Sequence, residues 1–235
     1  MALLELVGVV VVDGGVERLN RCSLTVRPGE VLGLAGPTAS GKSTLLAVAA
    51  GQRSPERGRV TWEGREVTRS PERLRARAAL AGHELPGPRG LAIEAWLALW
   101  ASLDGVPAAT LRERSPALLT RFELTRVKGR PVETLSRGEA RRLGWVRAWL
   151  AEPKLLLLDA PDDGVDGAGL RILTLAVREA ASAGATVILA CTAPPLATSL
   201  CDRVAVLQAG AVVHDLGRAE PGFAAGVAAG MGWTS

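Results

Sequence analysis

A glycine-rich stretch at residues 36–44 contains the residue types that bind a phosphate chain. Its sequence, GPTASGKST, matches the pattern Gly-x-x-x-x-Gly-Lys-Ser. The two glycines allow the backbone to turn so that successive N–H groups point at phosphate oxygens. The lysine is expected to reach the β- and γ-phosphates, and the serine hydroxyl to ligate Mg²⁺. We therefore predict an ATP site with these contact residues: Gly36, Pro37, Ser40, Gly41, Lys42, Ser43 and Thr44. A glycine-rich turn that binds nothing is the alternative.

Asp159 is a second candidate for the metal site. It follows four consecutive leucines, a run that is typical of a fully buried strand. In parallel sheets, ligands bind at the carboxyl ends of the strands. Asp159 is therefore expected to ligate Mg²⁺ together with Ser43, or to accept a hydrogen bond from metal-bound water. A lone aspartate after a strand can also cap a loop, but its combination with the phosphate loop favours the metal.

The elements that must position these residues alternate between strand and helix. We predict strands at 7–12, 22–26, 31–35, 60–62, 154–159, 186–191, 204–207 and 212–213, and helices at 43–50 and 170–183. Strands separated by helices of this length predict an α/β fold with a mostly parallel sheet covered on both faces. A helical pattern from about 70 to 150 indicates an inserted subdomain within a single domain, 1–235. The Gly/Ala-rich tail, 222–235, is expected to be peripheral.

The composition excludes several classes of protein. With 3% aromatic residues and no tyrosine, the chain lacks the aromatics expected between the charges of a nucleic-acid surface, so we expect no nucleic-acid partner. No apolar stretch approaches the ~20 residues that span a bilayer, and the start does not resemble a signal peptide. Three isolated cysteines fit a reducing compartment. We expect a cytoplasmic protein whose membrane role, if it has one, comes through a partner.

From about Leu3 to Val213 the sequence resembles the ATP-binding subunits of ABC transporters. The most specific mark is a stretch similar to the family's LSGGQ signature, made here of Leu135, Ser136, Arg137, Gly138 and Glu139. The resemblance implies a P-loop NTPase core with antiparallel strands at the N-terminus and an inserted helical subdomain. It also implies that each ATP lies between the P-loop of one subunit and the signature of another. The same stretch can be a helix N-cap with a capping box between Ser136 and Glu139, and both interpretations can hold together.

Two positions depart from the family pattern where hydrolysis takes place. Ala160 stands where the family has a glutamate that polarises the attacking water, and Thr192 stands where it has a switch histidine. Asp162 and Asp163 lie two or three residues further on, and Asp163 is a possible substitute. We identify no catalytic base here. We expect poor hydrolysis of ATP at this P-loop, because removing a general base typically costs about 10²–10⁴ in rate.

His83 aligns with the family's glutamine that senses magnesium. Its imidazole could ligate a metal or bond a water, and a surface-loop histidine is the alternative. The Gly-His pair followed closely by Pro-Gly also resembles the haem-exporter ATP-binding subunits of cytochrome c maturation. The region from 83 to 100, with Trp96 and Trp100 on one helix face, is expected to face the membrane partner, although such tryptophans are more often core residues.

The combined prediction is an ABC-type ATPase subunit that binds ATP and Mg²⁺ but hydrolyses poorly at its own P-loop. It would be the degenerate half of an asymmetric pair, with a transmembrane permease and a second, catalytic ATP-binding subunit as partners, on the cytoplasmic face of the membrane. The alternative is a nucleotide-gated regulatory or binding protein of the same family that takes no part in transport.

Overall fold

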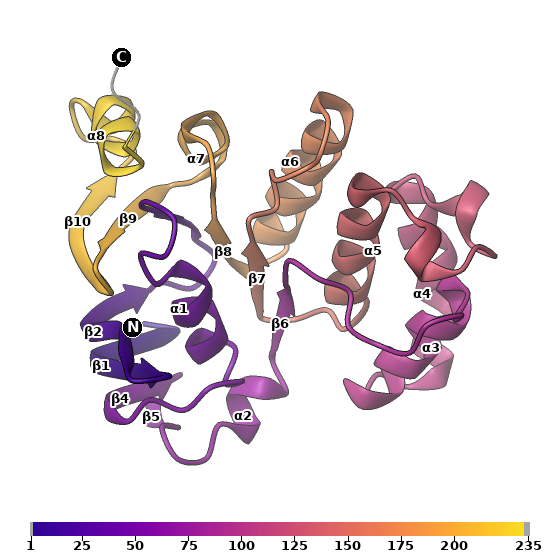
Figure 1. The fold of residues 1–235 in the computed structure, drawn as a ribbon, viewed down its shortest axis with the longest axis horizontal. Helices are drawn as coiled ribbons and strands as arrows, with labels where there is room; N and C mark the ends of the chain where they lie inside the picture. Colours follow the sequence, from indigo (N-terminus) through magenta and orange to yellow (C-terminus); the bar gives the residue numbers. More distant parts are fainter. Residues whose placement is uncertain (1, 233–235) are drawn as a thin grey trace.

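Two β-sheets form the centre of the fold (Figure 1). The computed structural model describes residues 2–232. The N-terminal sheet is antiparallel and has the order β2 (Val16–Val26), β1 (Leu4–Asp13), β4 (Arg57–Trp62), β5 (Arg65–Glu66). The second sheet has the order β10 (Ala211–Gly217), β9 (Arg203–Gln208), β3 (Val31–Ala35), β8 (Thr186–Ala190), β7 (Leu155–Asp159), β6 (Ala78–Ala81). All its neighbouring strands are parallel except β10 and β9.

The second sheet separates two hydrophobic cores. Leu155 and Leu157 of β7 belong to the core shared with the N-terminal sheet and α1 (Lys42–Ala49), whereas Leu156 and Leu158 belong to the core on the other face. Successive side chains of a strand point to opposite faces. A strand with both faces covered must therefore be apolar throughout, which explains the run of leucines before Asp159.

Three helices lie between β6 and β7 and form the side of the molecule away from the N-terminal sheet (Figure 1). They are α3 (Ile93–Leu103), α4 (Ala108–Arg121) and α5 (Arg137–Leu150). Phe122 packs edge-on against Trp145 and Trp149 of α5, with ring centroids 5.7 and 5.5 Å apart. The remaining helices are α2 (Glu72–Arg75), α6 (Gly167–Ser182), α7 (Pro194–Leu200) and α8 (Phe223–Gly230). The predicted fold class is confirmed: a mostly parallel sheet, N-terminal antiparallel strands and a helical insertion.

Two expectations about individual elements were wrong. The short strand β6 lies where a helical pattern was predicted, because its composition, Ala-Ala-Leu-Ala, favours helix and only its pairing with β7 makes it a strand. The C-terminal tail is not peripheral up to residue 232, since Phe223 and Val227 are buried in a core. Its glycines explain the packing: a Cβ on Gly230 would lie 2.7 Å from Val206, so only a glycine lets α8 come this close to β9.

Trp96 is a core residue, as the more frequent interpretation predicted. Its side chain is buried, and its indole N–H donates to the carbonyl of Pro86 over 3.0 Å. Trp100 donates to the same carbonyl over 2.9 Å. Both tryptophans thereby hold the loop before α3 against that helix. Over residues 2–232, no helix combines the length and the hydrophobicity needed to cross a membrane.

Candidate functional site

The predicted phosphate loop joins β3 to α1 and packs tightly against two other segments. Gly36 and Gly41 have φ values of 142° and 106°. A Cβ on Gly36 would lie 2.2 Å from the carbonyl oxygen of Leu207, and one on Gly41 would lie 2.6 Å from that of Arg18. Both positions thus need glycine for conformation and for space. The close contact with β9 and β2 fixes the loop that would surround the phosphates.

Lys42 begins α1 and its side chain returns over the loop. Its Nζ donates to the carbonyls of Gly36 and Pro37 over 2.8 and 2.9 Å. Burial lowers the pKa of Lys42, while the negative charge of Asp159 acts in the opposite direction. The ammonium group therefore stands over the loop and close to the predicted metal ligand, where a phosphate chain would need a cation.

Asp159 ends β7, and its register neighbour is Ala190 at the end of β8. β8 lies directly between β7 and β3, so Asp159 and the phosphate loop project from the same edge of the sheet. Residues 2–232 contain no group of three or more His, Cys, Asp or Glu side chains that could hold a metal alone. The donor set fits Mg²⁺, which binds through one or two protein oxygens and completes its shell with phosphate and water. Ser43 and Asp159 would supply those protein oxygens.

Ala160, which follows the predicted metal ligand, is buried and adopts a left-handed φ of 45°. Its N–H donates to the carbonyl of Ala190 over 2.9 Å, so the backbone is held in place. A methyl group cannot accept a proton. The backbone at this position is therefore fixed by a hydrogen bond, but its side chain cannot act as a general base.

Asp162 is held by the loop that follows β8. Its carboxylate accepts hydrogen bonds from the backbone N–H of Thr192 over 3.1 Å and of Ala193 over 2.9 Å. These groups precede α7 (Pro194–Leu200), so the carboxylate holds the segment that leads into that helix. The structure thus assigns Asp162 to holding the segment of Thr192, a contact that links residues far apart in sequence and has no local signal.

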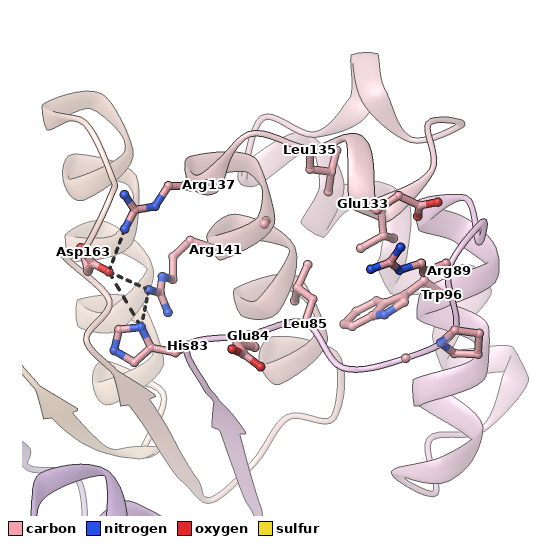
Figure 2. A pocket seen from close by; sticks show the side chains of 14 residues that line it. His83, Glu84, Leu85, Arg89, Trp96, Glu133, Leu135, Arg137, Arg141 and Asp163 are labelled. Atoms are coloured by element: carbon pink, nitrogen blue, oxygen red, sulfur yellow. Dashed lines mark hydrogen bonds and ion pairs between the residues drawn. The ribbon is translucent and has the colours of Figure 1, made fainter.

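Asp163 faces the helix that carries the predicted signature (Figure 2). Its Oδ2 lies 3.5 Å from an Nη of Arg137, 3.5 Å from an Nη of Arg141 and 3.8 Å from Nδ1 of His83. The carboxylate is therefore surrounded by cations of α5.

His83 lies beyond the end of β6, and its Nδ1 is 3.0 Å from Nη2 of Arg141. A guanidinium can only donate, so Nδ1 must be the acceptor and the ring proton sits on Nε2. Nδ1 is thus already occupied, and Nε2 is the nitrogen left to bond a water. Sequence reasoning missed Arg141, which forms the centre of this group.

The predicted signature begins α5 as an N-cap. The Oγ of Ser136 accepts from the N–H of Glu139 over 3.2 Å, and the N–H of Ser136 donates to the Glu139 carboxylate over 2.7 Å. The capping-box interpretation is confirmed. Arg137 is exposed, with 83% of its side chain accessible. Leu135 precedes the N-cap Ser136, and Gly138 follows Arg137. As a helix N-terminus, the start of α5 presents backbone N–H groups and the positive end of a helix dipole.

Replacing Glu139 by glutamine should make the free energy of unfolding depend less on pH in the acid range. The hydrogen bond from the Ser136 backbone lowers the pKa of Glu139 from its ordinary value of 4.5. The charged form is thus favoured by folding, and this stabilisation is present above pH 4.5 and lost as the pH falls below it. Urea unfolding should show Glu139→Gln about 0.5 kcal/mol less stable at pH 7, because the cap remains but the charge at the helix start is lost. The difference should shrink below pH 4; a constant difference would contradict this.

A cleft of about 690 Å³ separates the loop after β6 from the start of α5 (Figure 2). One end is lined by His83, Arg141 and Asp163, and the other by Trp96 and Arg89. Part of the region predicted to face a partner, 83–100, therefore forms one wall of this cleft. The opposite wall is the start of the predicted signature helix.

Comparison with known proteins places these features in context. The model of the family described as "ABC transporter" matches residues 19–163. The daunorubicin/doxorubicin resistance ATP-binding protein DrrA of Streptomyces peucetius is 32% identical over 90% of this chain, which spans 64% of that relative's length. The cytochrome c biogenesis ATP-binding export protein CcmA of Paramagnetospirillum magneticum is 34% identical over 76% of this chain and 82% of its own. A solved ATP-binding subunit of an ABC transporter superposes with a TM-score of 0.82 at 27% identity, over 92% of this chain and 90% of the other.

Proposed function

The chain belongs to the ABC transporter family as an ATP-binding subunit, and from this premise we propose that it retains MgATP at its own P-loop far better than it hydrolyses it. The observation that carries the proposal is the contrast between the two sides of the site. The phosphate loop, Lys42 and Asp159 are in place, whereas Ala160 supplies no base. A water molecule facing such a site would lack the group that takes up its proton.

The neighbouring carboxylates support this proposal rather than compensating for Ala160. Asp162 is engaged by the backbone of Thr192 and Ala193. Asp163 is paired with Arg137 and Arg141 of α5. Each carboxylate thus already has partners within the chain. The hydroxyl of Thr192 can donate a hydrogen bond to a phosphate but cannot take the place of an imidazolium.

We further propose that the chain pairs with a different ATP-binding subunit. Its signature, with Ser136 and the N–H of Gly138 at the start of α5, would contact the ATP held by that second subunit. The helix dipole at this end favours an anion. The second subunit would carry the missing base, so hydrolysis takes place in the site that this chain completes. ATP in the site of this chain would then serve to hold the two subunits together.

The membrane partner is proposed to dock at the cleft between the loop after β6 and the start of α5. The cleft contains both charged and apolar residues, including Arg89, Glu133 and Leu85. The subunit would lie on the cytoplasmic face of the membrane. The similar proteins have names that refer to drug resistance and to cytochrome c biogenesis, so the similarity supports transport without selecting a cargo.

Co-purification tests the proposed assembly. The tagged chain should be recovered from detergent-solubilised membranes together with a multi-span membrane protein and a second ATP-binding protein that has a glutamate after its Walker B aspartate. Recovery in a purely soluble complex would favour the alternative, a nucleotide-gated regulatory protein. Recovery of two copies of this chain as the only ATP-binding subunits would contradict the asymmetric pair.

A further inference from the structure

We propose that Arg141 is a positioning residue that joins the signature helix to the carboxyl ends of β6 and β7, so that the signature and the Asp159 end of the nucleotide site move as one unit. This inference rests on the proposed function for the role of Asp159, but the structural link can be tested without nucleotide.

The guanidinium of Arg141 contacts two separate segments of the chain. It donates to the carbonyl of Gly82 over 3.1 Å and to Nδ1 of His83 over 3.0 Å, both in the loop after β6. It also reaches the carbonyl of Asp159 and the carboxylate of Asp163, each at 3.5 Å, in and after β7. Figure 2 shows the side chain extending from α5 between His83 and Asp163. One side chain thereby connects α5 with the ends of two adjacent parallel strands.

Burial makes this connection costly to break. Only 7% of the Arg141 side chain is exposed, compared with 83% for Arg137 on the same helix. Burial lowers the pKa of Arg141, and the negative charge of Asp163 acts in the opposite direction. A desolvated guanidinium needs acceptors for several N–H groups, and the surrounding loops provide them. The loops in turn are held in one arrangement by the geometry of the guanidinium.

The position of Arg141 would let a movement at the cleft reach the nucleotide site. His83 and Asp163 line the cleft at which we place the membrane partner, and Asp159 is the proposed ligand of Mg²⁺. A displacement of the loop that carries His83 would therefore act on Asp159 and on the start of α5 through the same side chain. Without Arg141, the start of α5 would keep the exposed pair of Arg137 with Asp163, but the hydrogen bonds from α5 to Gly82, His83 and the carbonyl of Asp159 would be lost.

Arg142 provides a matched control. It is the next residue of α5, 17% of its side chain is exposed, and it pairs with Glu123 over 3.0 Å. Its contact lies within the helical insertion and does not involve the loops after β6 or β7. Arg142→Met removes a similar charge and a similar ion pair from the same helix, so it controls for general destabilisation.

Hydrogen exchange on the full chain tests the link directly. The N–H groups of Ala160 and Asp163 donate to the carbonyls of Ala190 and Ala160, so their exchange reports opening of the loop after β7. In Arg141→Met, peptides that cover 159–164 should exchange about 10-fold faster or more, because hydrogen bonds to a charged group are lost. Arg141→Lys should lie between wild type and Arg141→Met, and Arg142→Met should match wild type in these peptides. Unchanged exchange in folded Arg141→Met or Arg141→Lys, or equal acceleration in Arg142→Met, would overturn the proposal.

A nucleotide titration tests what the link does. Arg141→Lys should weaken binding of MgATP about 5-fold while leaving binding of ATP in EDTA unchanged, because Asp159 acts through the metal and the phosphate loop does not. An equal loss with and without Mg²⁺, or no loss, would overturn the role assigned to Arg141 at the site. If wild type bound no ATP at all, the proposed function would fail, whereas the exchange experiment would still decide the structural link.

Discussion

Replacing Lys42 by alanine is expected to weaken MgATP binding by about 100-fold or more. The ammonium group donates to the carbonyls of Gly36 and Pro37 and experiences the negative charge of Asp159. Lys42 is the only lysine or arginine at 36–44. Each hydrogen bond from a cation to an anion is worth about 1.5–3 kcal/mol, so losing two of them corresponds to about two to four orders of magnitude. Isothermal titration with MgATP measures the effect.

Lys154→Ala is the matched control for that measurement. Lys154 is a half-exposed lysine whose Nζ pairs with Glu63 over 2.8 Å, away from the phosphate loop. Its replacement should leave the affinity for MgATP within about twofold of wild type, as expected for an exposed ion pair. If Lys42→Ala bound MgATP as tightly as Lys154→Ala, the nucleotide would not be held by the loop at 36–44.

Replacing Ala160 by glutamate is expected to raise ATP turnover by about 100-fold. A positioned general base contributes about 10²–10⁴ in rate, and the lower end applies because Thr192 still stands where the family has a histidine. The backbone at this position is held by the hydrogen bond from Ala160 N–H to Ala190, so the new side chain starts from a fixed point. Release of phosphate at a protein concentration that allows two copies to pair measures the gain.

Ala160→Gln separates the base from the added bulk. Glutamine has the size of glutamate but cannot take up a proton at neutral pH. It should leave turnover at the wild-type level, and thermal unfolding of both variants shows whether the buried position accepts the longer side chain. Equal turnover in folded Ala160→Glu and in wild type would contradict the claim that the missing carboxylate limits hydrolysis.

The phosphate loop and the strands beside it could be predicted because their signals are local. The strand at 31–35 was predicted with the bounds that the structure shows, and the leucines before Asp159 indicated a buried strand that the sheet confirms. The capping box at Ser136 follows from two residues three positions apart. In each case the physical cause lies within a few neighbouring residues.

The features that could not be predicted depend on contacts between distant segments. The strand β6 exists because it pairs with β7, and α8 packs closely on the sheet because its glycines approach β9 and β10. The sequence placed Asp163 near the site but gave no indication that two arginines of α5 pair with it. In the sequence, nothing distinguishes Arg141 from the other arginines of the predicted helices. Only the fold shows that its side chain is buried between two loops.

The central claim is that this chain retains MgATP at its P-loop far better than it hydrolyses it. The most direct test is to follow what happens to the bound ATP. The purified chain is incubated with MgATP, separated rapidly from free nucleotide, and the bound nucleotide and the released phosphate are measured beside Lys42→Ala. We predict that wild type retains nucleotide as intact ATP, that Lys42→Ala retains little, and that both release phosphate at the same background rate. Bound ADP together with Lys42-dependent phosphate release at about 1 s⁻¹, a rate ordinary for an enzyme, would contradict the claim.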